Sequence, residues 1–511
     1  MADVVDQQAN TVLVGGSGPD HATPQRLLLP YANRHGLIAG ATGTGKTVTL
    51  QTLAESLSLA GVPVFLADVK GDLAGMACAG SAEARPHAAF ADRAARMGLP
   101  LDYQAFPVTF WDIWGQKGHP VRTTPAEMGP LLLSRLLDLT DAQEGVMNIA
   151  FRVADEQGLA LLDLKDLQAM LVWVGQNAAD LSLRYGNVGT ASVGAIQRAL
   201  LVLENQGGDR LFGEPALDLA DIIRRDASGR GVVNILAADR LMQSPRLYAT
   251  FLLWLLSELF EQLPEVGDPD RPRVAFFFDE AHLLFDGAPR ALVEKVEQVA
   301  RLIRSKGVSL WFVSQNPADI PEGVLGQLGN RVQHALRAFT PKDQKALRMA
   351  AENYRANPGF DTADAIQHVA TGEAVTSLLE DKGVPGMVQR TLIRPPFSRM
   401  GPITDAERAG VMAASPMGIK YARTIDRDSA HELLARRTSD AAKAKDEALF
   451  DMNRAEYRNA RRYQPRDEAR SPSSRSDSIV ETFGKSLARQ LGTKSGQAIV
   501  RGVLGSLLRG R

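Results

Sequence analysis

A glycine-rich run between residues 40 and 47 has the residue types and spacing of a phosphate-binding loop. Its sequence, Gly40-Ala41-Thr42-Gly43-Thr44-Gly45-Lys46-Thr47, matches G-x-x-x-x-G-K-[ST]. In such a loop the backbone N–H groups and the lysine bind phosphate oxygens, and the threonine hydroxyl is a ligand for Mg²⁺. A chance match is the alternative, but a strand-like segment precedes the run and a helix-like segment follows it, so we predict an ATP and Mg²⁺ site. The residues expected to contact the nucleotide are Gly40, Ala41, Thr42, Gly43, Thr44, Gly45, Lys46, Thr47 and Val48.

An acidic pair follows a second apolar segment. Val274–Phe278 is typical of a buried strand, and Asp279 and Glu280 come directly after it. A carboxylate at a strand end beside a phosphate loop can hold Mg²⁺, which is the role we predict for Asp279 together with Thr47. Glu280 can take a proton from an attacking water as a general base. An ordinary pair of strand-end acids is the alternative. Together with the loop, the pair predicts a Mg²⁺-dependent ATPase, which converts ATP and water to ADP and phosphate, rather than a small-molecule kinase.

A third apolar segment, Ser309–Val313, leads into a polar run, Ser314–Pro317. An amide at this strand end can contact the γ-phosphate or the attacking water, and we predict this role for Gln315. A turn satisfied by Asn316 and its proline is the alternative.

Arginines near these segments are candidates for stabilising the transition state from a neighbouring subunit. Arg304 precedes the third segment and Arg331 follows it, and we predict that these two act in trans. Arg301 and Arg337 are further candidates, and simple solvation is the alternative for each arginine. The histidines at positions 282 and 334 are expected to pack or form hydrogen bonds, because no second ligand stands at metal spacing.

Strand-like and helix-like segments alternate around the motifs, which is the pattern of a mostly parallel α/β sheet. Further strands are expected at Arg331–Phe339 and, as a hairpin, at Glu373–Leu379 and Gly386–Ile393, and a long solvated helix is expected at Asp426–Arg462. From about Ala126 to Gln206 the apolar residues recur at helical spacing instead, which predicts an all-helical insertion. The expected organisation is a strand pair or flap at 1–35, an ATPase core at 36–125 and 207–400, the helical insertion at 126–206, a helical region at 401–465, a linker at 466–478, and a basic amphipathic tail at 479–511.

The composition sets outer limits on function. The chain has 511 residues, a formal net charge of -1 and 45% hydrophobic residues, which is ordinary for a globular protein. Cys78 is the only cysteine, so neither an intramolecular disulfide nor a cysteine metal cluster is possible. The N-terminus lacks the pattern of a signal peptide, and no apolar run is long enough to span a membrane. We therefore expect a cytoplasmic protein with no integral membrane segment.

Four stretches together resemble the HerA/FtsK superfamily of hexameric ATPases, and more closely the bacterial HerA-like proteins related to YjgR. The superfamily resemblance rests on Gly40–Thr47, Ala67–Asp72, Phe278–His282 and Ser314–Pro317, and the closer one on Asn33–Gly36 and Gly329–Arg337. The resemblance implies a RecA-like core, a homo-hexameric ring with ATP between subunits, and translocation of double-stranded DNA. HerA proteins proper carry an N-terminal β-barrel that docks a nuclease. Fewer than 40 residues precede the loop here, so we expect neither that barrel nor a nuclease partner.

Two functions remain open at this point. The first is a DNA-translocating ring ATPase, supported by the resemblance and by the basic residues of the 479–511 tail, which suit phosphate contacts. The second is a ring ATPase that moves or remodels protein without nucleic acid, supported by the near-neutral net charge and the lack of a recognisable DNA-binding module. The tail could equally bind a membrane surface or a partner, or be disordered.

Overall fold

The computed structural model describes residues 4–285 and 290–461 of the chain. These residues belong to two compact units, 1–438 and 439–511. The linker and tail predicted for residues 466–511 lie outside the described residues. Within the described ranges, no helix combines the length and the apolar character needed to cross a membrane.

One sheet of thirteen strands organises the first unit, in the order β1-β2-β13-β12-β11-β4-β10-β9-β5-β8-β6-β7, with β3 paired to β2. The strands are β1 Val5–Asp6, β2 Thr11–Ser17, β3 Thr23–Leu28, β4 Gly36–Ala39, β5 Val64–Asp68, β6 Val108–Asp112, β7 His119–Pro120, β8 Val233–Ala237, β9 Val274–Phe278, β10 Val308–Ser314, β11 Asn330–Gln333, β12 Glu373–Ser377 and β13 Gln389–Ile393. Every pairing from β11 through β4 to β7 is parallel, and the pairings from β1 to β11 are antiparallel. The predicted α/β fold with a mostly parallel sheet is confirmed.

Both faces of the parallel strands are buried, which explains why their sequences are continuous apolar runs. Along β9, Phe276 and Phe278 belong to one hydrophobic cluster, and Ala275 and Phe277 belong to another. The first cluster includes apolar residues of α10 (Pro245–Gln262) and α11 (Arg290–Leu302), and the second includes those of α1 (Lys46–Leu59). Alternate side chains of β9 therefore point to opposite faces of the sheet, and helices pack on both faces.

The N-terminal residues extend the sheet as an antiparallel hairpin. β2 and β3 pair with each other, and Gly15–Ser17 of β2 pair with Thr391–Ile393 of β13. The predicted hairpin of β12 and β13 is present as well. β12 ends at Ser377, before the predicted Leu379, and β13 begins at Gln389, after the predicted Gly386. The predicted strand Arg331–Phe339 is shorter in the structure, because it pairs with β4 only as far as Gln333 and Ala39. β4 ends there, at the start of the glycine-rich loop.

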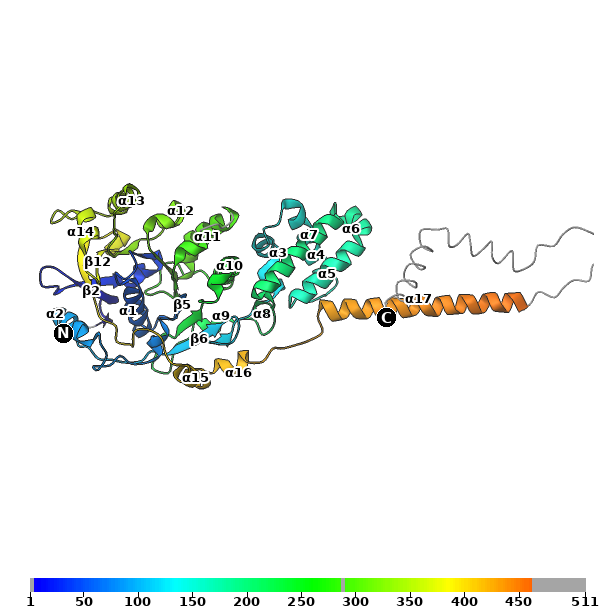
Figure 1. Ribbon diagram of the computed structural model, residues 1–511, viewed down its shortest axis with the longest axis horizontal. Helices are drawn as coiled ribbons and strands as arrows, with labels where there is room; N and C mark the ends of the chain where they lie inside the picture. Colours follow the sequence, from blue (N-terminus) through cyan, green and yellow to red (C-terminus); the bar gives the residue numbers. More distant parts are fainter. Residues whose placement is uncertain (1–3, 286–289, 462–511) are drawn as a thin grey trace, which may run out of the picture. The chain divides into compact units, whose positions relative to one another are not determined.

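Five helices lie in the stretch for which a helical insertion is predicted, and they pack against one another (Figure 1). They are α3 Pro125–Leu136, α4 Asp141–Glu156, α5 Leu164–Gln176, α6 Ala178–Tyr185 and α7 Thr190–Leu203. Capping boxes begin three of them, at Thr124, Thr140 and Asp163, so side chains satisfy N–H groups that the helices leave unpaired. A π-helical turn, Glu204–Gly208, ends the group. The exact domain boundaries stay a prediction.

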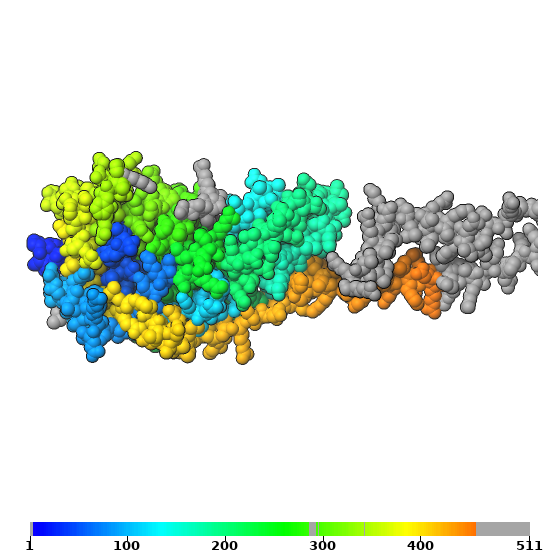
Figure 2. All heavy atoms as spheres, in the orientation of Figure 1, coloured from blue at the N-terminus to red at the C-terminus, as the bar shows by residue number. Residues whose placement is uncertain are grey.

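A C-terminal segment then runs back across the sheet domain, drawn in yellow and orange in Figure 2. It holds α15 (Asp405–Ala414), which contacts β6, and α16 (Met417–Tyr421), which contacts β7. Backbone hydrogen bonds tie it down at both ends, from Gly75 to Gly401 and from Ile425 to Glu214. The long helix predicted after it is α17, Ala430–Arg461, whose described side chains are exposed beyond its first turns.

A buried ion pair joins α1 to the chain that leaves β13. Arg394 and Glu55 are both fully buried, with Nη1 and Oε2 3.0 Å apart. Glu55 also accepts hydrogen bonds from the backbone N–H groups of Phe397 and Ser398. Breaking a buried pair on one side leaves an uncompensated charge, which costs far more than losing an exposed pair.

We expect Arg394→Met to lower the free energy of unfolding by roughly 3–5 kcal/mol, since Glu55 stays buried and unpaired. Thermal and urea unfolding followed by circular dichroism measure this. Arg427→Met is the matched control, because it breaks an exposed pair with Glu214 and should cost less than about 1 kcal/mol. Equal losses in the two variants would mean that the Arg394 pair contributes no more than a surface one.

Candidate nucleotide site

The glycine-rich loop leaves the carboxyl end of β4 and enters α1, as its sequence predicts. Gly40, Gly43 and Gly45 have φ values of 150°, 80° and 116°, which side-chain-bearing residues rarely adopt. A Cβ on Gly40 would lie 2.5 Å from the Cβ of His334, so the backbone approach itself requires glycine there. The spacing of the glycines therefore has a local cause: it allows a tight turn that presents its N–H groups at the start of a helix.

Lys46 is folded back over its own loop. Its side chain is buried, and Nζ donates to the carbonyl oxygens of Gly40 at 2.6 Å and Ala41 at 3.1 Å. Burial lowers the pKa of Lys46, while Glu280 opposes this and the charge of Lys70 reinforces it. The lysine thus lies where a phosphate held by the loop would meet it.

The acidic pair lies at the same edge of the sheet. β10 separates β9 from β4, so the carboxyl ends of all three parallel strands open toward the loop. Asp279 is 4% exposed, and its Oδ1 accepts from the N–H of Glu280 at 2.9 Å. Its Oδ2 is buried and has no hydrogen-bond partner in the described part of the chain.

That orphaned oxygen fits a magnesium ion. Mg²⁺ is bound in such sites by one or two protein oxygens and by substrate phosphates, rather than by a cage of side chains. In keeping with this, the described residues contain no group of three or more His, Cys, Asp or Glu that could hold a metal. Asp279 and the half-buried Thr47, in the first turn of α1, are the residues that would hold the ion.

Burial, followed by the charge of Glu280, raises the pKa of Asp279 to about 6. Because this folded-state pKa lies above the unfolded value of about 3.9, the carboxyl contributes stability at low pH that is lost as the pH rises to about 6. We expect Asp279→Asn to remove this loss, so between pH 4.5 and 7.5 the stability of the variant relative to wild type should rise by roughly 2 kcal/mol, seen as a relative gain in melting temperature. The measurement is thermal unfolding without nucleotide or Mg²⁺. Asp239→Asn, at an exposed position, is the control, and a gain that does not vary with pH would contradict the expectation.

Glu280 is held from three sides. Lys70 Nζ lies 2.7 Å from Oε1, and Gln315 Nε2 and His282 Nδ1 lie 3.4 Å and 3.5 Å from Oε2. Burial alone would raise the pKa of Glu280, but the hydrogen bond and charge of Lys70, with Gln315, hold it below its usual value. Glu280 also has φ 48° and ψ 49°, a left-handed conformation that is uncommon outside glycine and tends to occur at functional sites. The structure therefore brings Glu280 and Gln315 together, and their roles as general base and sensor amide stay predictions.

The loop after β5 belongs to the Ala67–Asp72 stretch of the family resemblance, but the sequence predicts no role in the site for its residues. Asp68 Oδ1 accepts from the N–H of Gly71 at 2.8 Å and its Oδ2 from the N–H of Leu73 at 3.1 Å, which closes a tight loop. This loop presents Lys70 to Glu280, and Asp72 Oδ1 is buried with no hydrogen-bond partner among the described residues. The available signal was positional: β5 ends at the same sheet edge as β9, so polar residues after it should meet those after β9.

His334 supports the loop from beneath. It is fully buried, with Nε2 2.8 Å from Thr49 Oγ1 and Nδ1 2.8 Å from the carbonyl oxygen of Glu373. Burial lowers its pKa to about 4, so the ring is neutral at physiological pH. It therefore forms hydrogen bonds, which is the role expected for it from the sequence.

The predicted arginines lie apart from this chain's own loop. Arg304 precedes β10, at the amino edge of the sheet, and its Nη2 is 3.0 Å from Asp268 Oδ1. Arg331 lies opposite Leu37 in the ladder, and its guanidinium donates to the carbonyl oxygens of three residues, Leu325, Leu328 and Asn353. The two arginines therefore do not reach the site of their own subunit.

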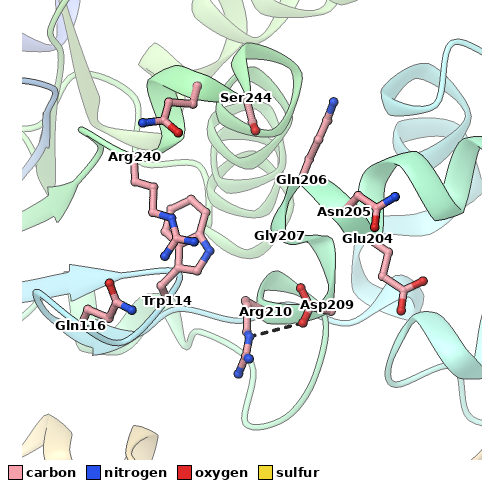
Figure 3. Close-up of a pocket in the computed structure, with 11 residues that line it drawn as sticks. Trp114, Gln116, Glu204, Asn205, Gln206, Gly207, Asp209, Arg210, Arg240 and Ser244 are labelled. Atoms are coloured by element: carbon pink, nitrogen blue, oxygen red, sulfur yellow. Dashed lines mark ion pairs between the residues drawn. The ribbon is translucent and has the colours of Figure 1, made fainter.

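Besides a cavity of about 560 Å³ lined by His282 and Gln315, two others open at the carboxyl edge of the described sheet. One, of about 370 Å³, adjoins the phosphate loop and is lined by Ala41, Thr42, Gln315, Asn316, Leu336, Arg337, Asp343 and Ala346. Arg337, rather than Arg304 or Arg331, is thus the candidate arginine that lies beside the loop within one chain. The other cavity, of about 500 Å³, lies beyond the ends of β6 and β8, where Arg240 stacks on the Trp114 ring at 4.5 Å (Figure 3). None of the predicted site residues lines it.

Comparisons with known proteins agree with the motifs. A family model described as "Helicase HerA-like C-terminal" matches residues 17–511. The DNA double-strand break repair helicase HerA of Sulfolobus acidocaldarius is 26% identical over 170 residues, 32% of this chain and 33% of the relative. The match thus spans about one third of that relative's length. Among solved structures, the plasmid coupling protein TrwB with a non-hydrolysable GTP analogue overlaps 76% of this chain and 92% of its own, at 13% identity and a TM-score of 0.48. VirB4 of Thermoanaerobacter pseudethanolicus overlaps 79% and 99%, at 17% identity and a TM-score of 0.47.

Proposed function

The chain belongs to the helicase HerA-like C-terminal family, as a nucleotide-binding P-loop NTPase, and we propose that it is an ATP-hydrolysing motor that translocates double-stranded DNA. The observation that carries the ATPase part is the meeting of Lys46, Asp279 and Glu280 at one sheet edge, from segments more than two hundred residues apart. Phosphoryl transfer needs these three things: a cradle for phosphates, a metal ligand and a base that orients water.

In the proposed reaction, water attacks the γ-phosphorus in line, and the bond from that phosphorus to the β–γ bridging oxygen breaks. Glu280 accepts a proton from the water, the electron pair leaves with ADP, and inorganic phosphate is released. Lys46 and the loop N–H groups hold the phosphate oxygens, and Gln315 is placed to orient the water. Bound Mg²⁺, held by Thr47 and Asp279, would supply charge neutralisation at the phosphates.

We propose that the active form is a homo-oligomeric ring, taken as a hexamer from the family resemblance, in which Arg304 or Arg331 completes a neighbour's site. Arg304 is the better candidate for this role, because its side chain is partly exposed, whereas the guanidinium of Arg331 donates to carbonyl oxygens of its own chain. Mixing Arg304→Ala with Lys46→Ala should then recover activity through hybrid interfaces, because each variant supplies what the other lacks. If no mixing ratio restores hydrolysis, the arginine does not act in trans.

The DNA part of the proposal is supported by the curated relative, whose name is that of a DNA double-strand break repair helicase. The test is the ATPase rate with and without double-stranded DNA, at low and at moderate salt. DNA should raise the rate, and added salt should reduce the effect, because phosphate contacts release counterions. A rate that ignores DNA at both salt concentrations would favour the second candidate, a ring ATPase that moves protein.

A further inference from the structure

Lys70 contacts the acidic pair directly, yet neither the phosphate-loop motif nor the acidic pair itself gives it a role. It belongs to the loop Asp68–Asp72, which the carboxylate of Asp68 closes through two backbone N–H groups. Gly71, with φ 75°, makes the turn possible. The loop is therefore built to present this lysine at the carboxyl edge of the sheet, beside Glu280.

The two side chains of the Lys70–Glu280 pair differ in how exposed and how tightly held they are. The glutamate side chain is 6% exposed, and two further side chains contact its second oxygen. The lysine side chain is 45% exposed, and Glu280 is the only carboxylate with which it forms an ion pair among the described residues. Lys70 can therefore swing away on its flexible stem while Glu280 stays in place.

The observed pairing conflicts with the glutamate's proposed task. A general base needs an oxygen free to accept a proton from water, and an ammonium group 2.7 Å from Oε1 occupies one of the two. The other oxygen faces Gln315 and His282. Lys70 thus covers part of Glu280 and makes it a weaker base, and to draw the lysine away a group must attract it more strongly than Glu280 and the nearby charges of Asp279 and Asp72 do.

The charges around Lys70 identify what that is. The ammonium groups of Lys46 and Lys70 lie close enough for the charge of Lys70 to lower the pKa of Lys46. Two neighbouring cations at the mouth of a phosphate loop are best satisfied by a group with several negative charges. The terminal phosphate of ATP is such a group, and it carries more charge than Glu280.

We propose that Lys70 is a catalytic residue that binds the γ-phosphate of ATP, and that its transfer from Glu280 to this phosphate frees the glutamate to act on water. The proposal rests on the ATPase function proposed above. The proposal explains how Lys70 can distinguish ATP from ADP. ADP has no γ-phosphate to attract Lys70, so the lysine stays paired with Glu280.

The decisive measurement is the ratio of affinities for ATPγS and ADP, obtained by titration calorimetry with full-length protein and Mg²⁺. In Lys70→Met this ratio should fall on the order of tenfold or more, because a charge-assisted contact made only to the γ-phosphate is lost. The kcat should fall by roughly 10²-fold with KM changed less, and Lys70→Arg should restore most of both. Lys117→Met is the matched control, since that lysine also pairs with a carboxylate, Asp239 at 2.6 Å, at the same edge of the sheet.

An unchanged ATPγS-to-ADP ratio in Lys70→Met would overturn the proposal, whatever happens to kcat. A raised kcat with an unchanged ratio would also overturn it, because Lys70 would then only restrain Glu280. A purely structural role would lower both affinities together, with no rescue by arginine, and this too contradicts the proposal. Wild-type protein that fails to hydrolyse ATP would instead refute the proposed ATPase function. The affinity ratio does not depend on hydrolysis, so the two failures can be told apart.

Discussion

Lys46→Ala should lose nucleotide binding by on the order of 10²-fold and show no measurable ATP turnover. The substitution removes the side-chain cation of the phosphate loop, whose Nζ lies over the loop beside the carbonyl oxygens of Gly40 and Ala41. The remaining donors of the loop are backbone N–H groups, which orient phosphates but carry no full charge. Titration calorimetry with ATPγS and a phosphate-release assay measure the two effects.

A folding defect must be separated from this result, because Lys46 is buried. Circular dichroism and thermal unfolding of the variant should match wild type, since the loop glycines and α1 remain. Lys117→Ala removes an exposed lysine at the same edge of the sheet and should bind and hydrolyse ATP normally. Turnover at the wild-type rate in Lys46→Ala would remove the central claim that this loop holds the nucleotide.

The parts of the site that follow from the sequence are those fixed by contiguous residues. Gly40–Thr47 carries its own geometry, and Val274–Phe278 with Asp279 and Glu280 is a buried strand with acids at its end. Because parallel strands align their carboxyl ends, the meeting of these motifs was foreseeable, and the structure shows it.

Contacts between distant segments carried no local signal. The Lys70–Glu280 pair joins residues 210 positions apart, and the Arg394–Glu55 pair joins residues 339 apart. A single sequence shows Lys70 as one more loop lysine and Arg394 as one more arginine before a proline. Lys70 meets Glu280 because β5 lies beside β9, and Arg394 meets Glu55 because the end of β13 lies near α1. A pattern of apolar residues does not predict which elements are neighbours.

Strand ends were misjudged where a neighbour, rather than the strand's own residues, sets the limit. The sequence predicts a strand from Arg331 to Phe339, but the ladder stops at Gln333 because β4 turns into the glycine-rich loop after Ala39. β6 gave no signal at all, as Val108–Asp112 is short and follows a proline. It is ordered by β8 alongside it and by α15, nearly three hundred residues later in the chain.

Glu280→Gln should bind ATP as wild type does but hydrolyse it roughly 10²–10⁴-fold more slowly, because the amide cannot accept the proton of the attacking water. The substitution keeps the shape of the side chain and a carbonyl oxygen for Lys70 or Gln315, so the surrounding loops should remain in place. Single-turnover hydrolysis after rapid mixing separates the chemical step from product release.

The comparison that decides the role of Glu280 is with its neighbour. Asp279→Asn should weaken the binding of Mg²⁺–ATP, since it removes the buried oxygen that fits the ion, whereas Glu280→Gln should leave that affinity unchanged and trap the ATP-bound form. Filter binding of ATP at varied Mg²⁺ concentration distinguishes the two variants. The two adjacent carboxylates would then have different roles, with the buried Asp279 holding the metal ion and Glu280 accepting the proton from water. Hydrolysis at the wild-type rate in Glu280→Gln, alongside an inactive Asp279→Asn, would assign the activation of water to another group.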